Sequence, residues 1–102
     1  MDTTGQDTRI EKLLVVRNKN GLHARPSSVL AEMALRFTET TLTLRKEADG
    51  ASTEVDAKSI MELMLLAAGP GTELMLTASG PQAAEATDAL ADLFERQFDL
   101  NL

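Results

Sequence analysis

His23 is the only histidine of the chain, and it lies between Gly21 and Arg25 where an extended segment is expected to give way to a helix. The first amides of a helix have no partner within the helix, and the helix dipole adds partial positive charge there, so an anion is favoured. A neutral imidazole is a competent nucleophile, and a guanidinium binds phosphate oxygens in a bidentate manner. The pattern therefore indicates a histidine suited to handling an anion, and a phosphoryl group on its ring would lie beside these donors. These residues alone leave open the alternative that His23 is an ordinary capping or surface residue.

The charge around His23 differs from that of the whole chain. The formal net charge is −6, but no acidic residue occurs from Lys12 to Ala31, where Arg17 and Lys19 precede the histidine. A stretch of this kind in an acidic protein suggests local attraction of an anion or an acidic partner. We expect Arg17 and Lys19 to contribute to partner docking. The alternative is that these charges cluster by chance on a solvated face, and the charge pattern by itself favours this alternative.

Composition argues against several other classes of function. The chain has 102 residues, one histidine and no cysteine, so we expect one domain with neither a disulfide framework nor a metal site, and no other cofactor. A net charge of −6, with three Phe and no Trp or Tyr, disfavours nucleic-acid binding. No apolar run approaches the ~20 residues that span a membrane, and residues 1–9 lack the apolar core of a secretory signal. We therefore expect a cytoplasmic protein without membrane insertion.

The pattern of apolar residues predicts the elements that position His23. Helical spacing, strand alternation and the hairpin signal Asp49-Gly50 divide the chain into short segments. The predicted elements are, in order, a strand at 12–17, a helix at 24–37, strands at 41–45 and 54–57, a helix at 60–67, a strand at 72–78 and a helix that starts after Gly80-Pro81. This β-α-β-β-α-β-α order predicts an α+β fold in which helices cover one face of a mostly antiparallel sheet.

The helix expected at 60–67 begins with its own signal. Ser59 and Glu62 have the S-x-x-E spacing of a capping box, in which each side chain accepts a hydrogen bond from the backbone amide of the other residue. Around this core we expect a folded domain over residues 10–98, with a flexible extension at 1–9 and a short frayed tail at 99–102. We expect the chain to be a monomer.

Two motifs resemble those of one known family. Residues 20–26, Asn-Gly-Leu-His-Ala-Arg-Pro, resemble the active-site signature of HPr, the histidine-containing phosphocarrier family of the bacterial phosphoenolpyruvate-dependent sugar phosphotransferase system. Residues 57–61, Ala-Lys-Ser-Ile-Met, resemble the regulatory serine motif of that family, and residues 71–74 fit the start of its fourth strand. The resemblance covers roughly residues 10–94, and two motifs in register are more specific than one short pattern.

The resemblance implies a fold and an activity. It implies an open-faced β-sandwich, in which a four-stranded antiparallel sheet is covered on one face by three helices. It implies that phosphate from phosphoenolpyruvate passes through enzyme I to Nδ1 of His23 and then to a sugar-specific enzyme IIA domain. Arg25 would assist the phosphoryl group, and Asn20, Gly21 and Ala24 would support the loop and the phosphate.

The second motif implies regulation and docking. Ser59 would be a target of HPr kinase/phosphorylase, although Glu62 stands where the family often has a small residue, and its carboxylate would repel added phosphate. Ile60, Met61 and Met64 would form an apolar surface that docks partners, since methionine adapts to several surfaces. The alternative is that at least two of these three side chains belong to the core.

A different role within the same fold also fits the sequence. An HPr-like binding module in a nitrogen-related or catabolite-control branch would use phosphorylation as a signal and would have little or no role in sugar uptake. The sequence does not separate this alternative from sugar transport.

Overall fold

The computed structural model describes residues 8–99, which form four strands and three α-helices. In chain order the elements are β1 (Arg9–Val15), α1 (Ala24–Ala34), β2 (Thr41–Ala48), β3 (Ala51–Asp56), α2 (Ile60–Leu65), β4 (Glu73–Ser79) and α3 (Ala83–Glu95), followed by the short 3-10 turn η2 (Gln97–Asp99). The predicted order β-α-β-β-α-β-α is confirmed. No helix among the described residues is long and apolar enough to cross a membrane.

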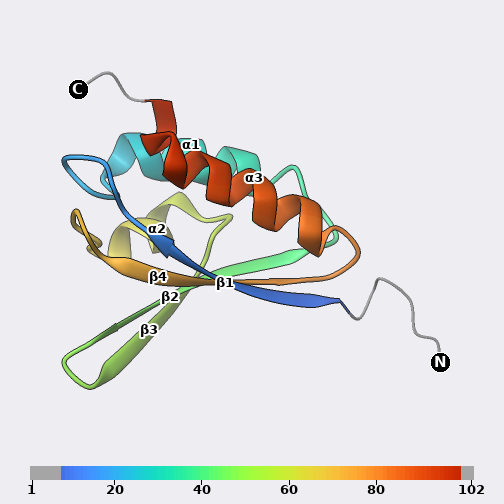
Figure 1. The fold of residues 1–102 in the computed structure, drawn as a ribbon, viewed down its shortest axis with the longest axis horizontal. Coiled ribbons are helices and arrows are strands. Elements are labelled where there is room, and N and C mark those ends of the chain that lie inside the picture. Colours follow the sequence, from blue (N-terminus) through green and yellow to red (C-terminus); the bar gives the residue numbers. More distant parts are fainter. Residues whose placement is uncertain (1–7, 100–102) are drawn as a thin grey trace.

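The four strands form one antiparallel sheet in the order β1-β4-β2-β3. Figure 1 shows α1, α2 and α3 on the same side of this sheet, with the other face left open. The open-faced β-sandwich that the family resemblance implied is therefore confirmed. Both connections that contain α1 and α2 cross the same face, which brings the start of α1 and the end of α2 to one edge of the molecule.

The core lies between the sheet and the helices. Strand alternation places Leu42 and Leu44 of β2 and Leu74 and Leu76 of β4 on the helix side, where all four are fully buried. The helices fill the other side of this layer with side chains at helical spacing, including Leu30, Ala31 and Ala34 of α1 and Ala86, Leu90, Leu93 and Phe94 of α3. Burial of this apolar surface is the main favourable contribution to the fold.

The β2–β3 hairpin extends beyond the rest of the sheet. β2 pairs with β4 only over 41–45, but its pairing with β3 continues to Ala48 and Ala51 (Figure 1). Asp49 and Gly50 have φ angles of 54° and 78°, as the predicted tight hairpin turn requires. β2 is therefore longer than predicted, because the projecting part has no buried face and so gives no apolar alternation.

The first two helices end earlier than predicted, at Ala34 and Leu65 rather than at 37 and 67. Two lysine side chains donate hydrogen bonds to backbone carbonyls in the turns that follow these helices. Lys58 Nζ donates to Phe37 O at 2.8 Å and to Thr40 O at 2.7 Å, while Lys46 Nζ donates to Leu66 O at 2.5 Å. A cation at the end of a helix satisfies free carbonyls and complements the helix dipole.

The ends of the folded region differ from the prediction. β1 begins at Arg9 instead of residue 12, and Thr8 O accepts a hydrogen bond from Gly80 N at 2.9 Å, so these two positions belong to the fold. Residues 1–7 of the expected extension lie outside the described residues.

At the other end, Asp99, which was expected to belong to the tail, contacts Arg96 after the end of α3. Its amide donates to Arg96 O at 3.0 Å, and its carboxylate forms an ion pair with the Arg96 guanidinium. The hydrogen bond that Arg96 Nε donates to the Asp92 carboxylate raises the pKa of Arg96. Phe98 packs edge-on against Phe94 with ring centroids 5.0 Å apart, which fixes this turn to α3. The rest of the expected tail, residues 100–102, lies outside the described residues.

Ala67 adopts a strained backbone conformation that predicts a stabilising substitution. It follows Leu66, the C-cap residue of α2, and has a φ of 49°, in the left-handed region that glycine occupies without steric penalty. We expect Ala67→Gly to raise the free energy of unfolding by about 0.5–1 kcal/mol, measured by urea denaturation. Ala68→Gly is the control, because Ala68 is buried and has no positive φ, so the same change there should destabilise the fold. Equal losses in both variants would contradict the strain argument.

Candidate functional site

His23 is the N-cap residue of α1, but its side chain does not cap the helix. Its backbone is extended, with φ −80° and ψ −168°, and its carbonyl accepts the first helical hydrogen bond from Ser27 N at 3.0 Å. No hydrogen bond joins the imidazole to the amides of the first turn. The capping part of the alternative is therefore wrong, whereas the part that makes His23 an ordinary surface residue is untested. The half-buried ring stands beside a helix end whose amides it leaves unpaired.

The first turn of α1 leaves a small group of donors next to the ring. In this turn Pro26 has no amide hydrogen, and Ser27 N is already bonded to His23 O. The amides of Ala24 and Arg25 in the same turn have no hydrogen-bond partner within residues 8–99. The Arg25 side chain is exposed and forms no ion pair with the described residues. Two amides and a guanidinium are thus available for the oxygens of an anion at this helix end.

The loop before His23 is held by backbone contacts with the segment after α2. Leu22 N donates to Ala68 O at 2.8 Å, and Gly21 approaches the same segment with a φ of +71°. A Cβ on Gly21 would lie 2.3 Å from Ala68 O, so only glycine fits this approach. The supporting role predicted for Gly21 thus has a specific structural reason.

Asn18 is a residue of this loop that sequence analysis missed. It is buried, its Nδ2 donates to Gly21 O at 2.6 Å, and its carbonyl accepts from Gly21 N at 3.2 Å, which closes the turn that precedes the histidine. Asn20, which was expected to support the loop, is exposed and makes no side-chain hydrogen bond to the described residues. An asparagine directly after a predicted strand was the available signal, but its burial is a tertiary property.

One of the two basic residues before the loop has an acidic neighbour in the folded chain. Arg17 lies 3.7 Å from Glu95 of α3, and both side chains are more than half exposed. Lys19 is exposed and forms no ion pair within residues 8–99. An exposed pair of this kind contributes little to stability, so Arg17 remains available for other partners.

Ser59 caps α2 as predicted, but Glu62 does not complete the capping box. Ser59 Oγ accepts a hydrogen bond from Glu62 N at 3.2 Å. The Glu62 carboxylate accepts from Asp56 N at 3.0 Å instead of from Ser59 N, which donates to Asp56 O at 3.1 Å. The second half of the predicted box is therefore wrong, because the end of β3 supplies a competing donor.

One side of α2 carries exposed apolar residues, which we call the α2 patch: Ile60, Met61, Met64 and Leu65, with exposed fractions of 41%, 78%, 45% and 73%. Only Leu63 of this helix is buried. The alternative that at least two of Ile60, Met61 and Met64 belong to the core is wrong. Leu65 was not singled out from the sequence, although it is among the most exposed members of the patch.

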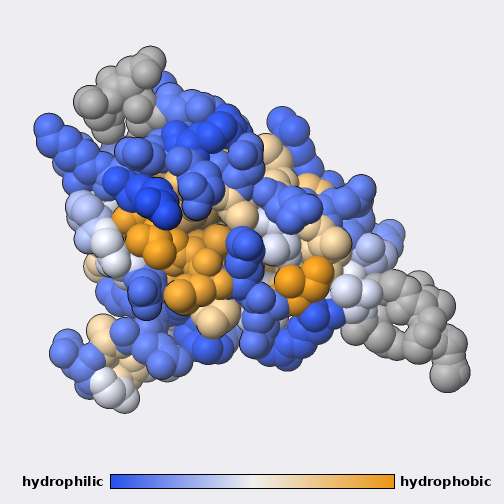
Figure 2. Space-filling view, in the orientation of Figure 1, coloured by the Kyte–Doolittle hydropathy of each residue, from blue (hydrophilic) through white to orange (hydrophobic). Residues whose placement is uncertain are grey.

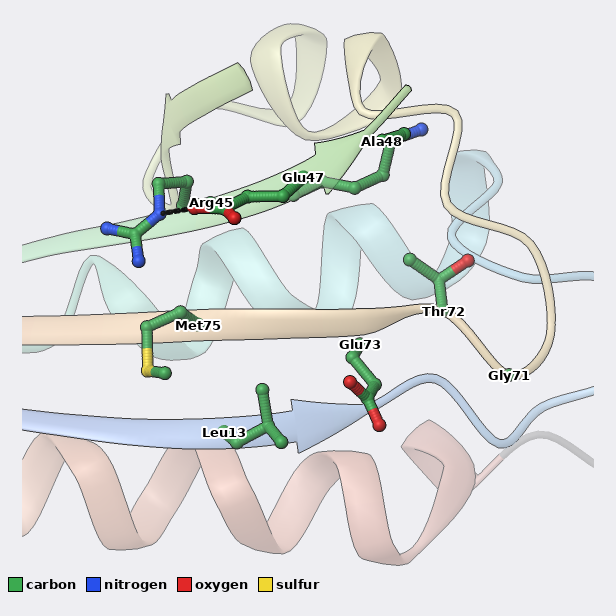
Figure 3. Close-up of a pocket in the computed structure, with 9 residues that line it drawn as sticks. Leu13, Arg45, Glu47, Ala48, Gly71, Thr72, Glu73 and Met75 are labelled. Carbon is green, nitrogen blue, oxygen red and sulfur yellow. Dashed lines mark hydrogen bonds and ion pairs between the residues drawn. The ribbon is translucent and has the colours of Figure 1, made fainter. Parts of the chain in front are cut away.

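Grooves elsewhere among the described residues lie away from His23. One of about 540 Å³ lies on the open sheet face, where Leu13, Met75 and Arg45 come from three neighbouring strands (Figure 3). Another of about 430 Å³ runs between β1 and α3, and an apolar area over the end of β1 interrupts the hydrophilic surface there (Figure 2). Neither groove includes His23 or Arg25. The described residues contain no group of His, Cys, Asp and Glu side chains that could hold a metal ion.

The chain is similar to known phosphocarrier proteins along most of its length. Residues 10–96 match the family model described as the phosphorylation site of the HPr component of the phosphotransferase system. The chain is 41% identical over 91 residues to the phosphocarrier protein HPr of Xylella fastidiosa (strain 9a5c), a match that covers 88% of this chain and 96% of the relative. It is 43% identical over 82 residues to the HPr-like protein Crh of Bacillus subtilis (strain 168), covering 80% of this chain and 91% of that relative.

Solved structures show the same similarity in three dimensions. The crystal structure of HPr-C-His from Thermoanaerobacter tengcongensis matches with a TM-score of 0.79 at 36% identity, covering 91% of this chain and 99% of that chain. Sequence and fold thus agree over nearly the whole domain, and the family model covers both motifs that suggested the resemblance. This chain belongs to the HPr family of phosphocarrier proteins of the phosphotransferase system.

Proposed function

We propose that this chain, in the cytoplasm, accepts a phosphoryl group from phospho-enzyme I on Nδ1 of His23 and passes it to enzyme IIA domains. The observation that carries the proposal is the position of His23 at the N-cap of α1 without a capping hydrogen bond. The imidazole is not committed to the helix, and the helix end beside it is ready for an anion. In the first transfer the bond between phosphorus and enzyme I breaks as the bond between phosphorus and Nδ1 forms. In the second transfer the bond to Nδ1 breaks as phosphorus forms a bond to the enzyme IIA acceptor.

The neighbouring donors have distinct roles in this proposal. The free amides of Ala24 and Arg25 would face the phosphoryl oxygens, and the Arg25 guanidinium would bind them from the solvent side. Such preorganised donors stabilise the charge that is shared between donor and acceptor during transfer. Gly21 and Asn20 belong to the turn that presents the ring, although Asn20 makes no side-chain contact that defines its contribution.

The test of the proposed transfer uses intact-protein mass spectrometry after incubation with enzyme I and phosphoenolpyruvate. We expect the mass of one added phosphoryl group, its loss in acid, and its disappearance when an enzyme IIA domain is added. Because His23 is the only histidine, acid-labile label on any other type of residue would overturn the proposal. Failure of label to appear with a competent enzyme I would overturn it as well.

We further propose that the α2 patch, together with Arg17 and Lys19, forms the docking surface for these partners. Four exposed apolar side chains on one short helix are an unusual feature for a free surface, and methionine side chains adapt to more than one partner. The exposed basic residues would attract acidic partners and speed encounter.

Leu65→Asp is expected to impair transfer from enzyme I without unfolding the protein. Leu65 is 73% exposed, so the fold loses little, whereas the docked state would hold an unpaired carboxylate in an apolar contact. We expect kcat/KM for transfer to fall about tenfold or more, mainly through a higher KM. This corresponds to a loss of about 1–2 kcal/mol of binding free energy on substitution of an interface residue. Leu13→Asp is the matched control, because Leu13 is 51% exposed on the open sheet face. Equal loss of transfer in both variants would contradict the proposed surface.

Ser59 is proposed as a regulatory phosphorylation site for HPr kinase. Its hydroxyl accepts the bond from Glu62 N, and phosphate at a helix N-terminus is electrostatically favourable, which supports modification with the fold retained. The Glu62 carboxylate is bonded to Asp56 N, but it still adds negative charge near the phosphate. Incubation with HPr kinase and ATP should label the wild type and leave Ser59→Ala unlabelled; an unlabelled wild type would contradict the proposal.

A regulatory role is a second candidate because of the similarity to Crh. The crystal structure of Crh, a catabolite repression protein of Bacillus subtilis, matches with a TM-score of 0.63 at 44% identity, covering 80% of this chain and 88% of that chain. If this chain acts in such a branch, its phosphorylated form will bind a regulator but transfer no phosphate to sugar-specific IIA domains. The transfer assay described above therefore separates the two candidates.

A further inference from the structure

Two buried polar atoms of the active loop have no hydrogen-bond partner among the described residues. They are Oδ1 of Asn18 and Nε2 of His23, and no other side-chain atom within residues 8–99 shares this state. Buried polar atoms are nearly always paired, because an unpaired one loses its hydration without compensation. The occurrence of both atoms in one short loop therefore requires an explanation.

The two atoms are chemically complementary. Gly21 O can only accept a hydrogen bond, so the nitrogen of the Asn18 amide must face it, and the 2.6 Å bond fixes the amide in that orientation. Oδ1 is therefore an acceptor that points elsewhere. In the neutral imidazole one nitrogen carries the proton and the other a lone pair. A nucleophilic Nδ1 requires the proton on Nε2, which makes Nε2 a donor.

We propose that Asn18 is a positioning residue whose Oδ1 accepts the Nε2–H proton of His23 through one bridging water. The proposal rests on the proposed use of Nδ1 as the phosphoryl acceptor. The hydrogen bond made by one ring nitrogen determines which nitrogen is protonated, so this contact selects the tautomer with its lone pair on Nδ1.

The contact also serves the phosphorylated state. When the bond from phosphorus to Nδ1 forms and the donor's bond breaks, the proton stays on Nε2, and no proton has to leave the buried side of the ring. Asn18 thereby links two tasks: Nδ2 closes the turn at Gly21, and Oδ1 orients the imidazole. A water molecule is a suitable bridge between two buried polar groups that need one donor and one acceptor.

The test measures the tautomer of His23 by ¹⁵N NMR of the unphosphorylated full chain at alkaline pH, where the imidazole is neutral. The wild type is expected to be mainly in the Nε2–H form. In Asn18→Ala the ratio of Nε2–H to Nδ1–H should fall about fivefold, the size of effect that one net hydrogen bond produces. Asn18→Asp keeps an acceptor oxygen but loses the donor to Gly21 O, so it should retain the Nε2–H form.

The Asp variant separates orientation of the ring from closure of the turn. If Asn18 acted only through Gly21, the Asp and Ala variants would shift the ratio alike, which would overturn the proposal. A wild type mainly in the Nδ1–H form would overturn it too. Thr87→Val is the control, because Thr87 is also buried and bonds a backbone carbonyl, Ala83 O, at 2.7 Å in α3. An unchanged tautomer in every Asn18 variant, with wild-type phosphorylation at His23 intact, would reject this inference and leave the proposed function standing.

Discussion

The His23→Ala variant is expected to take up no phosphoryl group from enzyme I and phosphoenolpyruvate while it keeps its fold. The chain has no second histidine, so no other imidazole can replace it. The half-buried ring makes no capping hydrogen bond, and its Nε2 has no partner among the described residues, so its removal breaks no direct hydrogen bond within residues 8–99. We therefore expect complete loss of the acid-labile label with a change in unfolding free energy of about 1 kcal/mol or less.

The matched variant for this experiment is Arg25→Ala. Arg25 is exposed, and its loss removes only a donor to the phosphoryl oxygens, so labelling should become roughly 10²-fold slower but still reach one phosphoryl group. Intact-mass spectra over time distinguish a slow variant from an inactive one, and thermal unfolding checks the fold of both. An acid-labile phosphate that persists in His23→Ala would refute the assignment of the acceptor.

Much of the fold follows from local patterns that the sequence displays. Leu42 and Leu44 alternate with polar neighbours, which predicts a strand with one buried face, and the structure places both in the core. The Asp49-Gly50 turn and the Ser59 cap depend on nearest neighbours in the chain, and both occur as predicted. The start of α1 after His23 was predictable for the same reason.

The differences arise where distant segments meet. Glu62 bonds Asp56 N rather than Ser59 N, and Arg17 meets Glu95 across the fold, which no local pattern indicates. α2 has only six residues, most of them apolar, so periodicity could not decide which side chains face the core. The burial of Asn18 likewise depends on how its loop packs.

The second large effect is expected at Gly21, where the active loop touches the segment after α2. A Cβ there would lie 2.3 Å from Ala68 O and 2.8 Å from Gly69 Cα. Both neighbours are backbone, and Ala68 O already accepts the bond from Leu22 N, so neither yields by side-chain rotation. We expect Gly21→Ala to lower the free energy of unfolding by about 2–5 kcal/mol, combining left-handed strain of ~1–2 kcal/mol with overpacking of ~1–3 kcal/mol.

Gly50→Ala separates these two contributions. Gly50 has a similar φ of +78° but nothing within 4 Å of an added Cβ, so it should lose only the strain of about 1–2 kcal/mol. Urea denaturation of both variants measures the difference, and equal losses would show that the contact with Ala68 is unimportant. Because relief of the clash must displace the loop, labelling at His23 should slow about 10²-fold in folded Gly21→Ala, as expected for a shift of ~1 Å at a reacting group. Gly50 lies at the hairpin tip, so Gly50→Ala should be labelled at the wild-type rate; a wild-type rate in Gly21→Ala would contradict the role of this contact in presenting the histidine.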